Sequence, residues 1–417
     1  MLNQTFDTKS LLQLTRKQEI IKFRLGRNID EYKESLDNIS KKIQHDNFNF
    51  ESLTLFTKDK RNIFSVDSDC DYYALKKLTY NLKRLYRIKF SNREDISEQV
   101  LKILEDGSHL KVIRVDIKNF FESVPFEDLI SKIKNDNLLS YKGVELLDKI
   151  KECLPKKFTG LPRGLAISSV LSELYMEVID KRIKELDRIY FYTRYVDDII
   201  IITPDLNLKF KSMVKPIISE HKLQSNNKTS EVVLNNITDS QQTKNIISYL
   251  GYEYEMDSLN SRSEDQRRLV AVRLSKNKLN KIKTRIIKAV LKYGKNNLSK
   301  EGEIELLKNR IEFLTGNYSL HNDNSKKSQY SEDMGTLKGG IYYNNKLIND
   351  LSNLTSLNIF LRNTVFCKRN SNLGKIVKSI PIRDRRYISS LCFKSGFEKR
   401  IFFNFTETQF KSICKCW

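Results

Sequence analysis

The chain has 417 residues, enough for two or three domains, and its 39% of hydrophobic residues is ample for packed cores. Its 74 Lys and Arg against 52 Asp and Glu leave a net charge of +22, which indicates a polyanionic partner, nucleic acid before membrane, because neutralising phosphates releases counterions. No signal peptide and no apolar stretch of membrane length is visible, so we expect a cytoplasmic protein without a membrane partner. The six cysteines are scattered and lack the spacing of a zinc site.

The first hundred residues predict helices around one hairpin. Apolar residues at three- and four-residue steps predict helical structure over residues 8–47. Two β-rich runs then flank a short polar stretch, which predicts a hairpin whose basic tip contains Lys60 and Arg61; a solvated charged turn is the alternative. A basic helix over residues 71–88 follows, and a further helix begins at Arg93.

The next segment predicts a strand that ends on a carboxylate. Strand-forming apolar residues precede Asp116 in the stretch LKVIRVD. Phe120 and Phe121 follow. Because alternate residues of an extended chain face opposite ways, we expect Phe120 in the core and Phe121 on the other side.

A glycine-containing loop then leads into a predicted helix. Gly160, Pro162 and Gly164 form a tight loop, and apolar residues at helical spacing begin at about Ala166. Glycines let the backbone approach a bound ligand closely. Arg163 lies between them, and a guanidinium holds a phosphate more firmly than an amide does.

The tetrapeptide YVDD lies between two β-rich runs, so we predict a hairpin whose tip carries Asp197 and Asp198. Adjacent aspartates repel, and keeping both ionised requires a cation of high charge density, usually Mg²⁺ for oxygen ligands. A polar turn without function is the alternative. Together with Asp116, these carboxylates suit two metal ions roughly 3.5–4 Å apart for in-line attack on a phosphate.

In these motifs the sequence resembles the reverse transcriptases, whose palm carries an Asp in a DxxxFF motif and a YxDD motif. The resemblance covers residues 51–256 well, through several motifs in order, and the remainder loosely. The sequence most resembles the defence-associated and abortive-infection groups of prokaryotic reverse transcriptases, and it resembles the reverse transcriptases of retrons and group II introns more distantly. Arg163 replaces the Gln of the family's LPQGxxxS motif. Ser169 stands at the position after the motif's Ser, where the family often has a Pro.

The resemblance implies an α+β fold of the right-hand polymerase type, with fingers, a palm built on an antiparallel sheet and a helical thumb, mostly helical outside the palm. The expected divisions are an N-terminal helical extension (1–50), fingers (51–110), palm with the first carboxylate (111–135), a fingers or loop insertion (136–165), palm with YVDD and primer grip (166–256), and helical thumb with C-terminal extension (257–417).

The resemblance also assigns roles to single residues. Asp116, Asp197, Asp198 and the backbone carbonyl of Ile117 would bind two Mg²⁺, with Mn²⁺ as a substitute. The ring of Phe121 would abut C2′ of the incoming sugar and so select dNTPs. The expected nucleotide contacts are Lys60, Arg61, Arg93, Arg163, Gly164 and Lys228, with Lys228 as general acid for the departing pyrophosphate. The expected primer grip is Leu250, Gly251 and Tyr252.

Residues 276–293 predict a helix with two stripes, one apolar and one basic, about 100° apart around the helix. The basic stripe consists of Lys278, Lys281, Arg285, Lys288 and Lys292. We expect the apolar face to pack and the basic face to follow a nucleic-acid backbone; a merely solvated face is the alternative.

The expected function is an RNA-directed DNA polymerase that copies a bound, noncoding RNA template into a DNA product in bacterial antiphage defence. One alternative is untemplated or protein-primed DNA synthesis of the abortive-infection type. Another is an RNA-directed RNA polymerase, against which Phe121 argues. A third is a noncatalytic RNA-binding scaffold, which the intact carboxylate triad disfavours. The sequence leaves the template, the priming mode and the oligomeric state open.

Overall fold

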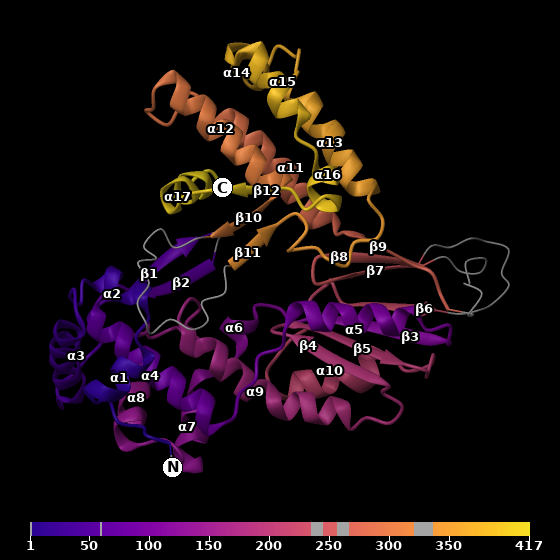
Figure 1. Ribbon diagram of the computed structural model, residues 1–417. Coiled ribbons are helices and arrows are strands. Elements are labelled where there is room, and N and C mark those ends of the chain that lie inside the picture. The colour runs from indigo at the N-terminus through magenta and orange to yellow at the C-terminus, as the bar shows by residue number, and fades with distance from the viewer. Residues whose placement is uncertain (1, 59–60, 235–244, 257–266, 321–336) are drawn as a thin grey trace. The chain divides into compact units, whose positions relative to one another are not determined.

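The computed structural model describes residues 2–58, 61–234, 245–256, 267–320 and 337–417. The chain divides into two compact units, the first formed by Met1–Ile96 with Ser108–Asn235 and the second by Ser97–Gly107 with Asn236–Trp417 (Figure 1). Helices and mainly antiparallel sheets occur in both units, which confirms the α+β class. The finer division into fingers, palm and thumb stays a prediction.

The first unit begins with helices, and the segment expected to be helical over residues 8–47 is helical in three pieces. Arg24 has a left-handed backbone with φ 53°, and Asn28 caps the third helix by accepting from the N–H groups of Asp30 and Glu31. The helices are α1 (Thr8–Leu14), α2 (Lys17–Phe23), α3 (Ile29–Gln44), α4 (Asp69–Leu85), the start of α5 (Arg93–Glu105), α6 (Phe120–Ser123), α7 (Phe126–Asp136), α8 (Tyr141–Cys153), α9 (Ala166–Lys184) and α10 (Phe210–Glu220).

The strands of the first unit confirm both predicted hairpins. They are β1 (Leu53–Lys58), β2 (Arg61–Val66), β3 (Leu110–Asp116), β4 (Phe191–Tyr195), β5 (Asp198–Thr203) and β6 (Ser230–Leu234). β1 and β2 form a hairpin of their own, and the other four form an antiparallel sheet in the order β4-β5-β3-β6. Of the predicted carboxylates, Asp116 ends the central strand β3, Asp198 begins the central strand β5, and Asp197 lies in the turn just before β5.

The register of β3 and β5 determines which side chains reach the core. Asp116 lies opposite Asp198 and Arg114 opposite Ile200, so these side chains share one face of the sheet. The other face packs into the core with residues of α9 and α10, and its buried side chains are Ile113, Val115, Ile199 and Ile201. A slip of one residue would turn the aspartates into the core, so this apolar face fixes the position of the carboxylates.

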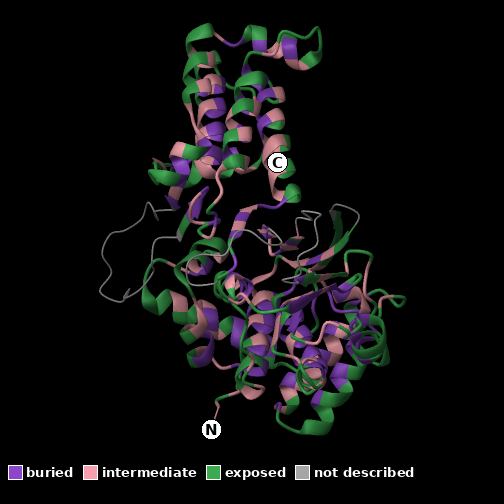
Figure 2. Cartoon of the chain, turned by 90° about the vertical axis from the view of Figure 1, so that its right-hand side faces the viewer, coloured by how far each residue is buried: buried purple, intermediate pink, exposed green. Residues whose placement is uncertain are grey.

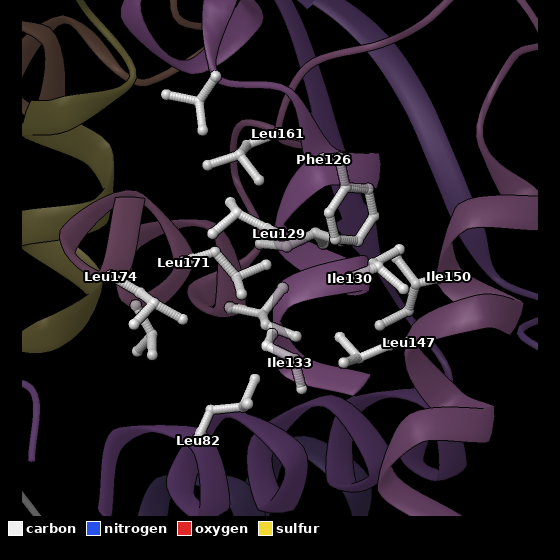
Figure 3. Packing of buried hydrophobic residues seen from close by; sticks show 14 of the residues in the cluster. Leu82, Phe126, Leu129, Ile130, Ile133, Leu147, Ile150, Leu161, Leu171 and Leu174 are labelled. Carbon is white, nitrogen blue, oxygen red and sulfur yellow. The ribbon is translucent and has the colours of Figure 1, made fainter. Parts of the chain in front are cut away.

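One continuous hydrophobic core supports the sheet. Figure 3 shows side chains from α4, α7, α8 and α9 pointing toward one another, among them Leu82, Ile133, Leu147 and Leu171. Along the helices, buried residues alternate with exposed ones (Figure 2), as expected for amphipathic helices. α9, which precedes the YVDD hairpin in the chain, is therefore anchored through its buried face.

The second unit combines two small sheets with helices. Its strands are β7 (Asn245–Tyr249), β8 (Tyr252–Met256), β9 (Val270–Leu274), β10 (Asn317–Leu320), β11 (Leu337–Gly340) and β12 (Phe402–Asn404). They form the sheets β7-β8-β9 and β11-β10-β12. Besides the rest of α5, its helices are α11 (Lys276–Leu291), α12 (Lys300–Thr315), α13 (Ser352–Val365), α14 (Asn372–Ser379), α15 (Ile382–Ser390), α16 (Phe393–Glu398) and α17 (Glu407–Cys414). Within the described ranges, no helix combines the length and apolar character that crossing a membrane requires.

The core face of β5 gives a test of this register. Ile201 is fully buried, so Ile201→Ala should lower the free energy of unfolding by about 2–5 kcal/mol through lost burial and a new cavity. Ile21 is 61% exposed, so the matched control Ile21→Ala should change it by less than about 0.5 kcal/mol. Urea unfolding followed by circular dichroism measures both; equal effects would show that this face is not a core.

Candidate active site

The YVDD turn holds its backbone in a conformation that costs free energy. Val196 has φ 59°, in the left-handed region, where a non-glycine residue is destabilised by about 1–2 kcal/mol and a β-branched residue is rarely found. Such outliers persist where the surrounding structure enforces them, and they gather at functional sites. In this turn the strained residue directly precedes Asp197.

Backbone hydrogen bonds join the strand end, the hairpin tip and a third loop. The N–H of Ile117 donates to the carbonyl oxygen of Asp197 at 3.2 Å, and the N–H of Asn226 donates to the carbonyl oxygen of Asp116 at 2.8 Å. Asp116 and Asp197, distant in sequence, are thereby fixed beside each other. The same bonds bring in the loop that carries Lys228.

These elements surround a cavity of about 340 Å³. Its lining residues are Arg61, Asn62, Asp116, Ile117, Lys118, Asn119, Phe120, Glu122, Arg163, Asp197, Asn226 and Lys228. The structure thus gathers six of the residues predicted from the sequence around one space: two carboxylates, three basic residues and Ile117. Lys60 lies outside the described residues, and the lining does not include Arg93, which begins α5.

The negative charge of Asp116 disfavours ionisation of Asp197 in this cavity. Asp116 is buried, and Asp197 is half-buried. Burial, and then the negative charge of Asp116, raise the pKa of Asp197, while Arg163 and Lys228 partly offset the increase. The ammonium Nζ of Lys228 lies 3.9 Å from Oδ2 of Asp116. A divalent cation fits this donor set, because hard oxygen ligands and mutual repulsion both favour one.

Asp198 has a different environment from the other two aspartates. Its carboxylate accepts two hydrogen bonds from Arg114, from Nε and Nη2, each 2.8 Å long. Burial raises the pKa of Asp198 even though this guanidinium lowers it. Within the described ranges no cluster of three His, Cys, Asp or Glu side chains has an arrangement that could hold a metal ion. Asp116 and Asp197 are the carboxylates that fit a metal in this structure, and Asp198 as a third ligand stays a prediction.

The two phenylalanines after Asp116 lie in a helical turn, which corrects the assumption of an extended chain. β3 ends at Asp116, and Phe120 and Phe121 begin α6. Phe120 is nonetheless in the core, 2% exposed, and Phe121 is half-buried. The guanidinium carbon of Arg163 lies 5.0 Å from the centre of the Phe121 ring, a cation–π contact that holds the ring in place.

Arg163 is held by an acid that the sequence analysis did not single out. Its Nε and Nη2 donate to the two carboxylate oxygens of Glu122, at 3.0 and 3.1 Å. Burial alone would raise the pKa of Glu122, but the ion pair with Arg163, a backbone hydrogen bond and the charge of Arg61 together hold the pKa below its ordinary value. Arg163 is therefore committed to Glu122 and to the ring beside it.

Gly164 joins this loop to the β1-β2 hairpin. Its φ is 104°, and a Cβ on it would lie 2.3 Å from the carbonyl oxygen of Phe64 in β2. The N–H of Phe64 donates to the carbonyl oxygen of Arg163 at 2.7 Å. Both the positive φ and the close contact with β2 require glycine at position 164. The observed role of Gly164 is to let the loop pack against the β1-β2 hairpin.

The predicted primer-grip residues form the expected hairpin. Leu250 and Gly251 connect β7 to β8 with φ 44° and 82°, and two positive φ values define the type I′ turn typical of two-residue hairpins. Tyr252 begins β8 and is buried. These residues belong to the second unit, and their function as a primer grip stays a prediction.

The predicted basic stripe on α11 is partly used within its own unit. Lys278 donates to the side chain of Asn345, Arg285 lies over the Trp417 ring at 5.3 Å, and Lys292 donates to the carbonyl oxygen of Lys415 at 2.9 Å. The two remaining members, Lys281 and Lys288, are exposed. A role of the stripe in nucleic-acid binding stays a prediction.

Three charged residues important to the site were missed from the sequence, although each left a signal there. Arg114 lies two residues before Asp116, so strand alternation places both on one face. Glu122 is an acid directly after the two phenylalanines. Arg194 is a charge inside the apolar and aromatic run before YVDD, where a buried cation needs anionic partners.

The family assignment follows from comparison with known proteins. A family described as "Reverse transcriptase (RNA-dependent DNA polymerase)" matches residues 36–254, more than half of the chain and the part that contains both carboxylate motifs. The chain therefore belongs to the reverse transcriptase family, a family of nucleotidyltransferases. No curated protein sequence matches it.

Two solved structures are similar to this chain at low identity. One is apo telomerase from Candida tropicalis, truncated from its C-terminal domain, with 15% identity, a TM-score of 0.35 and coverage of 54% of each chain. The other is telomerase from Candida albicans in complex with a fragment of telomeric RNA, with 12% identity, a TM-score of 0.32, and coverage of 82% of this chain and 53% of that chain. The chain spans about half the length of each.

The raised pKa of Asp197 predicts a change in stability. Between the ordinary aspartate pKa of 3.8 and the raised pKa in the fold, the folded protein binds more protons than the unfolded chain, so stability falls as pH rises through this window. Asp197→Asn removes the charge and should raise the unfolding temperature of the metal-free protein at neutral pH. The gain should vanish as pH falls to the ordinary pKa.

Thermal unfolding in the presence of a chelator measures this effect. Asp187→Asn is the matched control, because Asp187 is exposed and lies shortly before strand β4. It should leave the unfolding temperature nearly unchanged. A lower unfolding temperature for Asp197→Asn at neutral pH would mean that Arg163 and Lys228 compensate the charge more than burial penalises it.

Proposed function

We propose that this protein is an RNA-directed DNA polymerase that copies a bound RNA into DNA. The observation that carries the proposal is the convergence of Asp116, Asp197 and Lys228 on one cavity, beside Arg61 and Arg163, in a chain of the reverse transcriptase family. Two acids for metal ions and several cations for a triphosphate are the groups that nucleotidyl transfer requires.

In this proposal the carboxylates of Asp116 and Asp197, with the carbonyl of Ile117, hold divalent cations, Mg²⁺ or Mn²⁺. Such cations supply Lewis-acid activation of the primer hydroxyl and neutralise charge on the phosphates. Lys228 is 66% exposed in its side chain and lies beside Asp116, so its ammonium is free to reach the triphosphate. There it would donate a proton to the departing pyrophosphate, a general-acid contribution of roughly 10²–10⁴-fold.

Phe121 determines the proposed choice of sugar. Its ring is fixed by the Arg163 guanidinium, which Glu122 holds in turn. A ring held against C2′ of the sugar, as the family resemblance implies for this position, would leave no room for a 2′-hydroxyl, so dNTPs are the proposed substrates. The arrangement thus favours a DNA product over an RNA product.

The proposed template is a dedicated noncoding RNA, and the proposed setting is bacterial antiphage defence in the cytoplasm. The net charge of +22 supports binding of an RNA backbone, because each neutralised phosphate releases counterions. Exposed Lys281 and Lys288 on α11 are proposed to contribute to that binding. The departures from the family motif at Arg163 and Ser169 motivate the defence assignment, because the resemblance implies that both recur in the abortive-infection and phage-defence groups of bacterial reverse transcriptases.

The decisive experiment is to purify the protein from its native host and to sequence the bound RNA and the DNA it makes, beside an Asp197→Ala control. We expect DNA complementary to one discrete RNA. Asp197→Ala should lower the rate of incorporation by at least ~10³-fold, because it removes one of the two acids that would hold the metal. DNA unrelated to any bound RNA would instead favour untemplated synthesis, and undiminished biological activity of Asp197→Ala would favour a noncatalytic scaffold.

Phe121→Ala tests the sugar selection. Removal of the ring should raise the efficiency of rNTP incorporation relative to dNTP by at least ~10-fold, since a contact of one or a few kcal/mol then no longer rejects the 2′-hydroxyl. Single-nucleotide extension with matched dNTP and rNTP measures the ratio. Phe90→Ala, at a residue 47% exposed, is the control. Efficient rNTP incorporation by the unmutated protein would contradict this role.

A further inference from the structure

We infer that Arg194 is a positioning residue that holds the YVDD turn in the conformation presenting Asp197. The inference rests on the proposed function, since it assumes that Asp197 acts in nucleotidyl transfer. Two observations carry it: the hydrogen bonds of a buried guanidinium, and the strained backbone of Val196 that one of these bonds reaches.

Arg194 is 6% exposed and its donors are used on three sides. Nε and Nη2 donate to the carboxylate of Asp180, each at 2.9 Å. Nη1 and Nη2 donate to the carboxylate of Glu173, at 3.0 and 2.7 Å. Nη1 also donates to the carbonyl oxygen of Val196 at 2.9 Å. Because the guanidinium is a rigid planar fork, these three acceptors fix its position.

The two acids connect the guanidinium to the core. Glu173 and Asp180 lie about two turns apart on α9, so they share one face of the helix. The Tyr192 hydroxyl also donates to Asp180, at 2.6 Å, which ties a second residue of β4 to α9. The buried face of α9, with Leu171 among its residues, packs into the hydrophobic core. Arg194 thereby links the hairpin to a helix that is packed into the core.

The hydrogen bond from Arg194 to Val196 acts on the peptide unit between Val196 and Asp197. The carbonyl of Val196 belongs to the same peptide unit as the N–H of Asp197, so fixing this carbonyl fixes the orientation of the backbone that carries the aspartate. Val196 has φ 59°, and a valine released from its contacts would relax to negative φ. That relaxation would rotate the peptide and move Asp197 away from Asp116.

A purely structural ion-pair network is the competing explanation, because a buried arginine between two acids stabilises many folds without touching a site. The two explanations differ in the bond to Val196. If Arg194 acts by holding a strained turn, the need for it should fall when the strain is removed. Glycine at position 196 accepts a positive φ without strain.

The test is a double-mutant cycle with Arg194→Lys and Val196→Gly, using primer extension under steady-state conditions. Lysine keeps the buried positive charge, but all its donors are on one nitrogen. It therefore cannot bond to Glu173, Asp180 and the carbonyl of Val196 at the same time. Arg194→Lys should lower kcat by roughly 10²-fold, the cost of misplacing a reacting group by about 1 Å, with little change in the KM for the dNTP. In the Val196→Gly background the same substitution should lower kcat by about 10-fold or less.

Two controls accompany the cycle. Arg182→Gln removes an arginine of α9 that pairs with Glu220 and lies outside the hairpin, and it should leave kcat unchanged. Arg194→Gln leaves two acids without their cation, so a large loss of folding is expected for it. Arg194→Lys therefore carries the test, and thermal unfolding of each variant shows that the fold is retained.

Equal losses of kcat in the two backgrounds would overturn the inference, as would a higher KM at unchanged kcat. In either case dNTP incorporation by the unmutated protein would leave the proposed function standing. If the unmutated protein incorporates no dNTP on any RNA template, the proposed function fails and the inference fails with it.

Discussion

The repulsion between Asp116 and Asp197 is the constraint on which the rest of the site depends. Each carboxylate is at least partly buried, and the negative charge of Asp116 adds to burial in raising the pKa of Asp197. Left to side-chain freedom, the two groups would separate. The hydrogen bond from the N–H of Ile117 to the carbonyl oxygen of Asp197 keeps the backbone segments that carry these side chains together, because it does not depend on the side-chain charges. The neighbouring cations, Lys228 and Arg163, only partly offset the rise in the pKa of Asp197, which is compatible with the proposed metal site.

Rigid elements convert this constraint into a fixed geometry. The core faces of β3 and β5 are mainly apolar, with Lys111 and Thr203 as buried polar exceptions, so a change of register would displace buried isoleucine and valine side chains. α9 has two functions: its apolar face packs into the core, while Glu173 and Asp180 hold Arg194 of the hairpin. A site carried by strands and supported by a packed helix holds its side chains more closely than a site on loops.

Much of this arrangement could be predicted from the sequence, and the limits have physical reasons. The strand ending at Asp116, the YVDD hairpin and the helix from Ala166 are encoded by local periodicity and turn residues, which a sequence displays directly. The pairs Arg114 with Asp198 and Arg163 with Glu122 depend on which rotamer points where after packing, and no local pattern encodes that. The core position of Phe120 was predicted for the wrong reason, because the residues after the strand form a helical turn, and Phe121, expected on the other side, packs partly buried against the same core.

The pairing of Arg163 with Glu122 also changes the meaning of the arginine in place of the usual glutamine. Arg163 and Asp197 line the same cavity, and the positive charge of Arg163 lowers the pKa of Asp197. A guanidinium without another partner would be drawn to that carboxylate and would occupy the place of a metal ion. Glu122 prevents this by offering both its oxygens to Arg163 in a bidentate geometry, which is the strongest form of such a pair. An arginine at this position is therefore compatible with a metal site only together with its acid, and the two residues are best regarded as one functional unit.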